Sequence, residues 1–486
     1  MVVSLLSHLL TYIICLNIDL LNRDGLAPFV SVYLVAFAGV SPGAAGLIWF
    51  MKDVSHMVSQ IPIGVFVDRT THKKAFLVFF TLLTTLLPMT IVFTQNIPLL
   101  IAKSVLEGIG ATGLMVFKGP FTLGIAGHEN FEHAAKYTEM SEHSGSLVVC
   151  SIAGIIGYFV YPNVLPIFYV IGVFGSVSAL CLVLMVPKEN HRSVVDDDLA
   201  RNSRHHNIIF PTIKSTDSCD AFPIELPVGK QDRDELVQDE EPGIRTATCK
   251  KDIGSDGDDK EGGMSSGSSV NPSMEVLESE SIWNIFITNQ AMSFFTLSVF
   301  FFHLGNAAVL PLLGQVLAIE EGRNGIPYTA ALIVIAQITS MGGVHMFDFF
   351  TNRGYTINVP IMIGFGALFP RICCIFVLLN FSQNPYALLA TQVFDGLGAG
   401  VNGLAILRVT KTLTENTNRF GLVFSIVNTG GACGGALSNL VTGYLVDLTS
   451  YKVAMASLLA PGVLCLIFLS ITKVHAPLVK EGAQMS

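Results

Sequence analysis

Twelve long apolar stretches constrain the fold of this 486-residue chain more than any other feature. A helix that crosses a bilayer needs about 20 mostly apolar residues. Stretches of this kind lie at 5–37, 41–66, 75–94, 98–125, 133–160, 164–186, 282–318, 326–350, 356–380, 385–411, 419–446 and 452–473. Charged residues make up only 13% of the chain, about half the usual share. The sequence therefore predicts an all-α membrane protein with twelve transmembrane helices and excludes a soluble globular enzyme.

The negative charge is concentrated in the middle of the chain. Residues 188–281 carry 11 basic and 21 acidic side chains, so the remainder nets +1 although the whole chain nets −9. A segment with this composition cannot bury enough apolar surface to offset its chain entropy. We therefore expect a disordered acidic loop at 188–281, between an N-terminal bundle of six helices at 1–187 and a C-terminal bundle of six helices at 282–486.

Basic residues near the helix ends predict the orientation, because cytoplasmic loops carry the excess of Lys and Arg. On one side the loops hold only Arg323 and Lys452. The other side holds Arg69, Lys73, Lys74, Lys136, Lys188, Arg192, Arg353, Lys411 and Arg419. We expect both termini and the acidic loop to be cytoplasmic, in a plasma or organelle membrane. The N-terminus lacks a basic region and a cleavage signal, so its apolar stretch is expected to remain as a helix.

The two halves of the sequence repeat each other. Glu107-Gly-Ile-Gly-Ala returns as Asp395-Gly-Leu-Gly-Ala at an offset of 288 residues. Asp68, followed by Lys73, returns as Asp348 followed by Arg353 after the second helix of the other half. Several repeats in the same order indicate a duplication, which predicts two pseudo-symmetric six-helix bundles with a site at the midplane between them.

The loop between helices two and three carries the most specific motif, Gly64-Val-Phe-Val-Asp-Arg-Thr-Thr-His-Lys-Lys74. It resembles the G-x-x-x-D-R-x-x-[KR]-[KR] loop of the major facilitator superfamily, and the chain is similar to a branch of bacterial and fungal permeases whose substrates are generally unassigned. The resemblance implies the major facilitator fold and alternating access. It also implies a gating motif that locks the inward gate, formed by Gly64, Asp68, Arg69, Lys73 and Lys74 with a second copy at Asp348 and Arg353.

Two departures from the family pattern weaken an assignment of proton antiport. The Arg expected on helix four would fall at Ser104, with Lys103 one place away. Helix five lacks the G-x-x-x-G-P-x-x-G-G pattern that is typical of family antiporters.

Charges inside the apolar stretches are costly and need a reason. Helices three, six and twelve carry none, which predicts that they face lipid. The resemblance also places helix nine outside the cavity, where Arg371 is an exception.

Helix one carries polar residues on a shared face, because Asn22 and Arg23 lie three and four residues after Asp19. Together with Asp24, they form either a locally neutralised pair or an exchangeable carboxylate that releases Arg23 to bind an anion. On helix two, Lys52 and Asp53 are adjacent and point to different faces. We expect the charges of helices one and two to pair across their interface.

Glu107 and Asp395 each lie about ten residues into their helix and so near the midplane. Each is either a proton carrier or a permanently protonated hydrogen-bonding group. On helix five, Glu139, Glu142 and His143 have helical spacing and form the best candidate for a proton relay, with a zinc site as the alternative. The neutral candidates for substrate hydrogen bonds are His303, Asn306 and Asn402.

These residues predict a secondary transporter that moves a small solute by alternating access and is coupled to protons, with its direction unassigned. The alternative is a non-transporting receptor or transceptor that signals through the acidic loop. Catalytic motifs for hydrolysis or ATP use are absent from the sequence, so we do not expect an enzyme. We expect a monomer in the bilayer with a small solute and protons as partners, and without a nucleic acid, cofactor or metal.

Overall fold

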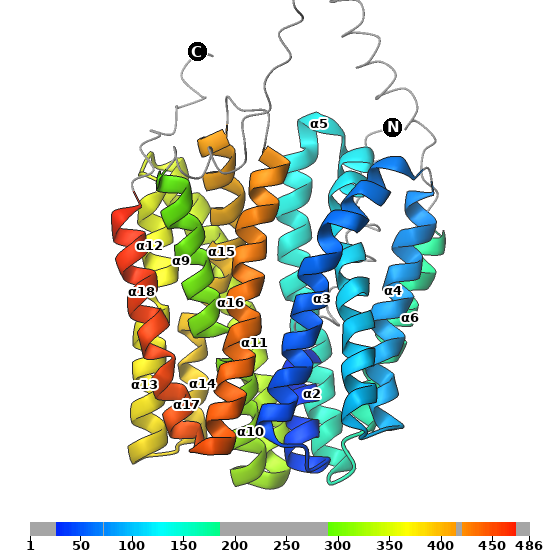
Figure 1. Ribbon diagram of the computed structural model, residues 1–486, viewed down its shortest axis with the longest axis vertical. Coiled ribbons are helices and arrows are strands. Elements are labelled where there is room, and N and C mark those ends of the chain that lie inside the picture. Colours follow the sequence, from blue (N-terminus) through cyan, green and yellow to red (C-terminus); the bar gives the residue numbers. More distant parts are fainter. Residues whose placement is uncertain (1–25, 71, 185–289, 415–419, 473–486) are drawn as a thin grey trace, which may run out of the picture. The chain divides into compact units, whose positions relative to one another are not determined.

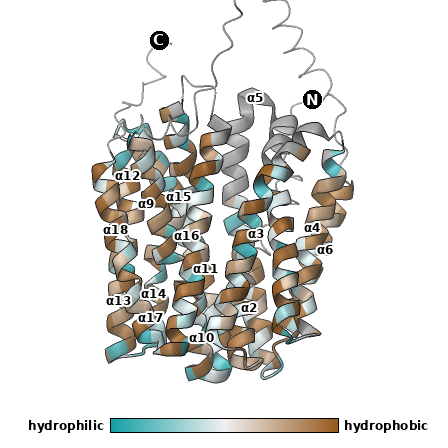
Figure 2. Ribbon diagram, in the orientation of Figure 1, coloured by the Kyte–Doolittle hydropathy of each residue, from teal (hydrophilic) through white to brown (hydrophobic). Residues whose placement is uncertain are grey.

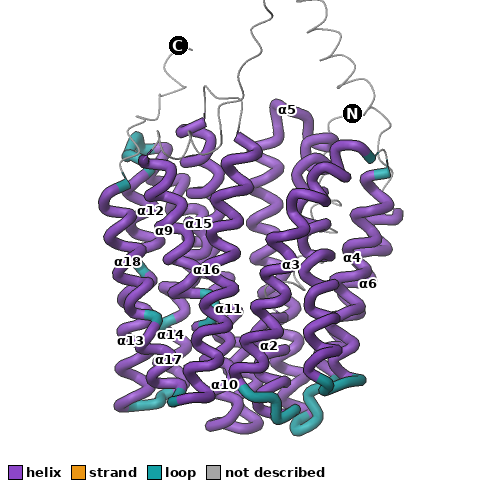
Figure 3. The backbone as a smooth tube through the Cα atoms, in the orientation of Figure 1, coloured by secondary structure: helices purple, strands orange, loops and turns teal. Residues whose placement is uncertain are grey.

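The computed structural model describes residues 26–70, 72–184, 290–414 and 420–472, and every regular element in these ranges is a helix (Figures 1 and 3). The described helices on both sides of the central segment belong to one compact unit. The acidic loop at 188–281 and the predicted bundle boundaries at 187 and 282 lie outside the described residues.

Most helices of the N-terminal half follow the predicted stretches, and the fourth and fifth stretches are the exception. The described part of the first stretch forms α2 and a π-helical turn, η1. The elements are α2 (Leu26–Val32), η1 (Tyr33–Phe37), α3 (Pro42–Arg69), α4 (Lys73–Met89), η2 (Thr90–Val92), α5 (Ile97–Val160) and α6 (Pro166–Leu184).

Helices of the C-terminal half also follow the prediction, although several are divided into two. The elements are α9 (Gln290–Asn306), α10 (Val309–Glu321), η3 (Gly322–Asn324), α11 (Gly325–Asn352), α12 (Asn358–Gly366), α13 (Leu368–Phe381), α14 (Pro385–Ala390), α15 (Gln392–Thr414), α16 (Phe420–Leu448), α17 (Tyr451–Ser457) and α18 (Leu459–Ile471).

The structure differs from the sequence prediction at the fourth and fifth stretches. The prediction separates 98–125 from 133–160, whereas α5 is helical without a break from Ile97 to Val160. The connecting residues 126–132 include one Ala and two Glu residues, which favour helix, and contain no Pro. The two apolar parts of α5, Ile97–Phe117 and Met140–Val160, are each long enough to cross a membrane.

Proline explains three of the divided helices. The breaks at Ala308, Ala367 and Leu458 each lie three residues before a proline, at positions 311, 370 and 461. A proline inside a helix lacks the N–H for the bond to residue i−4, and its ring clashes with that carbonyl group. The break between α9 and α10 therefore falls directly after Asn306, and the break between α12 and α13 falls four residues before Arg371.

Asparagine begins equivalent helices in the two halves. Asn96 accepts a hydrogen bond from the backbone N–H of Leu99 at the start of α5, and Asn384 accepts one from Tyr386 at the start of α14. Both are followed by a proline in the first turn, where a missing N–H is harmless. The two caps are 288 residues apart, as the sequence repeat predicts.

The described helices contain six segments that are long and apolar enough to span a membrane: Ile97–Phe117, Met140–Val160, Pro166–Leu184, Gln290–Asn352, Asn358–Phe381 and Tyr451–Ile471. Figure 2 colours α4, α6 and α18 mostly as hydrophobic. Rows of large apolar side chains are exposed on α6 (Val173, Val177 and Leu180) and on α18 (Val463, Ile467 and Ile471). This exposure is what a lipid-facing helix requires.

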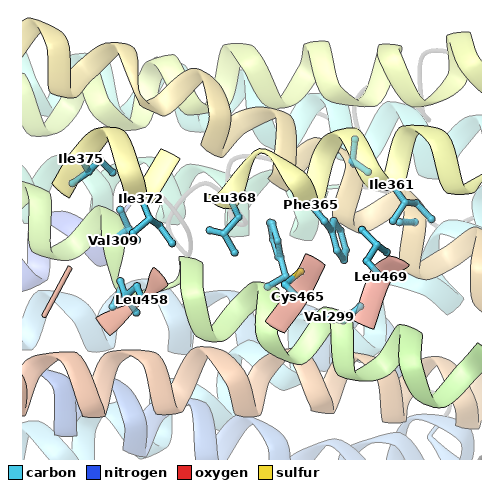
Figure 4. Packing of buried hydrophobic residues seen from close by; sticks show 14 of the residues in the cluster. Val299, Val309, Ile361, Phe365, Leu368, Ile372, Ile375, Leu458, Cys465 and Leu469 are labelled. Carbon is cyan, nitrogen blue, oxygen red and sulfur yellow. The ribbon is translucent and has the colours of Figure 1, made fainter. Parts of the chain in front are cut away.

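Two large apolar clusters hold the unit together. The larger joins α9, α10, α12, α13 and α18, and Figure 4 shows Phe365, Leu368 and Ile372 among its side chains. The second is built mainly from α2, η1, α3, α5 and α6, and it also includes Ala318, Ile326, Ala330 and Ile333 from the other half. The two halves therefore share apolar packing.

Glycines allow corresponding helices of the two halves to pack in the same way. A Cβ atom at Gly108 of α5 would meet Ser55 Oγ and the carbonyl oxygen of Lys52 on α3. A Cβ atom at Gly396 of α15 would meet Thr339 Oγ1 and the carbonyl oxygen of Ala336 on α11. Close backbone approach at these two glycines repeats the α3–α5 contact in α11–α15 and supports the predicted duplication.

This packing also corrects one detail of the predicted repeat. Ser55 corresponds to Thr339, which gives an offset of 284 residues for α3 and α11. In this register Asp68 corresponds to Asn352, and Asp348 lies one helical turn earlier. The sequence comparison placed Asp348 opposite Asp68 because short motifs do not determine the packing register of two helices.

Candidate functional site

A buried charge cluster joins α3 and α5 in the N-terminal half. Glu107 forms ion pairs with Lys52 of α3 and with Lys103, one turn earlier on α5, where the N–O distance is 2.7 Å. The Lys52 ammonium group also lies 4.6 Å from the centroid of the Trp49 ring. Two cations therefore share one carboxylate, which offsets the cost of burying their charges.

A second buried charge cluster joins α9, α13 and α15 in the C-terminal half. Arg371 is fully buried, and its Nη1 atom lies 2.8 Å from Asp395 Oδ1. Asn306 donates to the same carboxylate oxygen at 2.9 Å and accepts a hydrogen bond from Arg371. Arg371 Nη2 donates to Gln392 Oε1 at 2.7 Å. Three helices thus supply the groups that satisfy this ion pair.

The two carboxylates occupy equivalent places in the repeat. Glu107 and Asp395 are 288 residues apart, and each precedes a glycine that packs against the neighbouring helix. Each carboxylate pairs with a cation from a different helix, Lys52 of α3 or Arg371 of α13. A change in the charge of either carboxylate would therefore change contacts between helices.

His303 and Asn402 form a neutral polar contact beside the second cluster. Asn402 Nδ2 and His303 Nε2 lie 3.2 Å apart, between α15 and α9. Gly431 of α16 leaves room for the ring, because a Cβ atom there would lie 2.9 Å from His303 Cδ2. Among the described residues, Asn402 Oδ1 is buried and has no hydrogen-bond partner. This oxygen could accept a hydrogen bond from a solute.

Polar contacts connect the two halves at several depths. Thr429 Oγ1 of α16 donates to Gln60 Oε1 of α3 at 3.0 Å. His143 Nδ1 of α5 lies 2.5 Å from Gln337 Oε1 of α11. Gln315 of α10 donates to Ser31 of α2 at 2.7 Å. These contacts must rearrange if the halves move relative to each other.

Four predicted residues of helix one, Asp19, Asn22, Arg23 and Asp24, lie outside the described residues. The side chain of Glu139 on α5 lies outside them as well. In the part of the chain that the structure describes, Lys52 pairs with Glu107 of helix four, whereas we expected a partner on helix one. Asp53 and Glu142 are partly buried on α3 and α5, respectively.

The gating motif is described only in part. Gly64 lies within α3, while the side chains of Asp68, Arg69 and Lys73 lie outside the described residues. Lys74 Nζ donates to the carbonyl oxygen of Val183 on α6 at 2.8 Å. In the second copy, Asp348 Oδ1 lies 3.9 Å from Arg408 Nη2. The Arg353 guanidinium group stacks over the ring of Phe349.

Sequence reasoning left several polar residues out of the candidate site. Arg371 could have been assigned, because an arginine in an apolar stretch requires a partner and Asp395 is the available acid of the same half. Lys103 could have been assigned from its spacing to Glu107. The sequence gives no comparable signal for the remaining polar residues that the structure brings into these contacts, which are His56, Gln60, Thr112, Gln337, Gln392 and Thr429.

Comparison with known proteins agrees with this architecture. The sequence matches the profile of the Major Facilitator Superfamily over residues 12–370 and 357–484. The relatives include two proteins of Mycobacterium tuberculosis, named uncharacterized MFS-type transporters MT2531 (strain CDC 1551 / Oshkosh) and Rv2456c (strain ATCC 25618 / H37Rv). Each is 26% identical over 448 residues, which cover 91% of this chain and 88% of the relative.

Solved structures show the same fold. A mutant of the nucleoside transporter NupG superimposes with a TM-score of 0.64 at 9% identity, over 96% of this chain and all of that one (100%). A further structure of NupG gives a TM-score of 0.60 at 11% identity, over 96% and 99% of the two chains. The relatives and the solved structures support a membrane transporter of a small solute, and the chain belongs to the major facilitator superfamily and has its helical fold.

Proposed function

We propose that the protein is a proton-coupled secondary transporter. Two six-helix bundles, at 1–187 and 282–486, alternate in access around a site between them, and residues 188–281 connect the bundles on the cytoplasmic side, where both termini lie. The transporter works as a monomer with a small solute and protons, and it uses no cofactor or metal.

The observation that carries the proposal is the pair of equivalent buried carboxylates. Glu107 and Asp395 occupy matching repeat positions, and each is held by cations from its surroundings. A proton on either carboxylate would remove its charge and weaken its hold on Lys52 or Arg371. The energy of a buried charge pair is large enough to make proton binding and helix position depend on each other.

Solute recognition is assigned to the polar groups beside these clusters. His303 and Asn402 present hydrogen-bonding atoms from α9 and α15, and Asn402 Oδ1 is buried without a described partner. Asn306, three residues after His303, bonds directly to Asp395. A solute that displaces these hydrogen bonds would therefore act on the same network that holds the carboxylate.

A two-step experiment tests the proposal. A thermal-shift screen of the purified protein against panels of metabolites and drugs identifies a solute, because a ligand that binds the folded state raises its apparent stability. Uptake of that solute into proteoliposomes is then measured with and without an imposed pH gradient in both directions. We expect the gradient to drive accumulation in the wild type.

Matched substitutions identify the coupling groups. Glu107→Gln and Asp395→Asn should each lower gradient-driven accumulation at least about tenfold, which corresponds to about 1.4 kcal/mol. Glu320→Gln removes an exposed carboxylate of α10 and should leave accumulation unchanged. Accumulation that ignores the pH gradient in the wild type would refute the proposal.

A further inference from the structure

A chain of hydrogen bonds runs from α5 through α3 to α16. His56 of α3 is buried, with 6% of its surface exposed, and its Nδ1 atom lies 2.9 Å from Thr112 Oγ1 of α5. Its Nε2 atom lies 3.3 Å from Gln60 Nε2, one turn later on α3. Gln60 Oε1 in turn accepts a hydrogen bond from Thr429 of α16. A titratable ring is thus two hydrogen bonds away from the other half of the protein.

The contacts described for His56 are compatible with one neutral form of the ring. The hydroxyl of Thr112 can donate to the carbonyl oxygens of Gly108 and His56, at 3.0 and 2.9 Å. Ser59 Oγ lies 2.7 Å from the same Thr112 oxygen and can donate to the carbonyl oxygen of His56. The Thr112 oxygen is then available to accept from His56 Nδ1–H. The amide nitrogen of Gln60 is only a donor, so His56 Nε2 accepts from it. In this arrangement the ring is neutral and is protonated on Nδ1.

In the neutral arrangement, the hydrogen bonds at Thr429 compete. Its hydroxyl has one hydrogen but two acceptors, Gln60 Oε1 at 3.0 Å and the carbonyl oxygen of Ser425 at 2.8 Å. The contact between the halves therefore uses a hydrogen that the α16 backbone also attracts, which weakens this contact.

We propose that His56 is a proton-binding site that controls the contact between α3 and α16. A proton on Nε2 turns this atom into a donor, so the Gln60 amide rotates and its oxygen accepts from the ring. The Gln60 NH2 group then donates to Thr429 Oγ1, while the Thr429 hydroxyl donates to Ser425. The ring, the Gln60 amide and the Thr429 hydroxyl then donate and accept along one direction, and the bond to the ring becomes charge-assisted. Protonation of His56 therefore strengthens the contact between the halves.

The charges around His56 are compatible with this role. Among the described side chains, the charges on α3 closest in sequence to His56 are Lys52 and Asp53, about one turn earlier, and those on the facing part of α5 are Lys103 and Glu107. Lys52 and Lys103 are both paired with Glu107, which reduces their repulsion of a protonated ring.

Within the described part of the chain, the remaining packed segments add few charges. Glu142 and His143 lie on the later part of α5, where His143 bonds to Gln337. The described residues of α16 include the titratable side chains Cys433, Tyr444 and Asp447, and Asp447 bonds to Ser41 at the opposite end of the interface. Tyr33 is the titratable residue of η1.

This inference rests on the proposed function, since it adds His56 as a proton-binding site to the two carboxylates. The test uses the full chain in lipid nanodiscs with spin labels at Ile61 and Ser425, which are exposed beside the Gln60–Thr429 contact. Labels carried on a keto amino acid leave the nine native cysteines untouched. Electron paramagnetic resonance then reports the distance between α3 and α16 between about pH 5 and pH 8, the range in which histidine titrates.

In the wild type, we expect the short-distance population to increase as the pH falls, with its ratio to the long-distance population changing at least about fivefold, as one additional hydrogen bond predicts. His56→Gln should abolish this pH response, and Thr429→Val, which removes the acceptor on α16, should abolish it too. The control His345→Gln, which changes an exposed histidine of α11, should retain the response.

A wild-type distance that does not depend on pH would overturn the inference, as would a full pH response in His56→Gln. If His56→Gln does not fold, a pH response in Thr429→Val equal to that of the wild type overturns the inference. Failure of the proposed function is distinguishable, because it would appear as uptake without gradient dependence while the distance between α3 and α16 still responded to pH.

Discussion

Replacement of Arg371 by Met provides a quantitative test of the charge cluster in the C-terminal half. Arg371 is fully buried and donates to Asp395, Asn306 and Gln392. Removal of one partner from a buried ion pair costs about 3–5 kcal/mol, because the other charge remains in a medium that solvates it poorly. We therefore expect Arg371→Met to destabilise the protein by about 4 kcal/mol.

The effect on the melting temperature follows from the size of the chain. A change of 1 kcal/mol shifts the midpoint of a 150–250-residue domain by about 2–4 °C and that of a larger chain by less, so the apparent Tm should fall by roughly 5 °C. Thermal unfolding of detergent-purified protein at a fixed heating rate measures this shift. The double variant Arg371→Met with Asp395→Leu replaces the pair by apolar side chains, and its apparent Tm should return to within about 2 °C of the wild type.

These two variants also separate stability from transport. The double variant should fold but should not respond to a pH gradient, because it lacks the carboxylate. The reasoning is refuted if Arg371→Met lowers the apparent Tm by less than about 1 °C. It is also refuted if the double variant is less stable than the single one, since the cost would then not come from an unpaired charge.

Three further changes test the packing and the outer contacts. Gly108→Ala should lower the free energy of unfolding by about 1–3 kcal/mol, because the added Cβ atom pushes α5 away from α3. The control Gly342→Ala, which has open space around its Cβ position, should leave thermal stability nearly unchanged. Equal melting temperatures of the two variants would contradict this prediction. Asp447 of α16 accepts hydrogen bonds from Ser41 Oγ and the Gly43 backbone N–H at the start of α3. Asp447→Asn should weaken these bonds and raise the rate of amide hydrogen exchange over residues 42–48 several-fold. Unchanged exchange rates would show that this contact does not hold α3 and α16 together. Trp49→Leu should remove the cation–π contact with Lys52 and lower stability by about 1 kcal/mol, while Trp49→Phe should retain most of it; equal effects of the two variants would argue against that contact.

Much of the fold could be predicted from the sequence, because apolar length and turn residues are local signals. The asparagine and proline residues at 96, 98, 384 and 385 mark helix starts, and the structure places helix N-termini there. The prediction of a break between the fourth and fifth stretches was wrong, because residues that favour helix continue through the predicted loop.

The candidate site could be predicted only where its signals were local or electrostatic. Lys103 and Glu107 lie one turn apart, so their ion pair follows from helical spacing. The Lys52–Glu107 and Arg371–Asp395 pairs depend on which helices pack together and in which register, and sequence periodicity does not contain this information.

The chain of His56, Gln60 and Thr429 is harder still to predict from sequence. None of its members is an Asp, Glu, Lys or Arg residue, so the sequence shows no buried charge that would demand a partner. Their significance depends on the direction of each hydrogen bond, which only the placement of neighbouring donors and acceptors determines.

Proton coupling can be measured as proton movement driven by the solute. Proteoliposomes that contain the wild-type protein and a trapped pH-sensitive dye are given the solute found by the thermal-shift screen, without an imposed gradient. We expect solute entry to change the internal pH, and we expect Glu107→Gln and Asp395→Asn to abolish this change while solute binding remains. Solute entry by the wild type at constant internal pH would contradict this expectation.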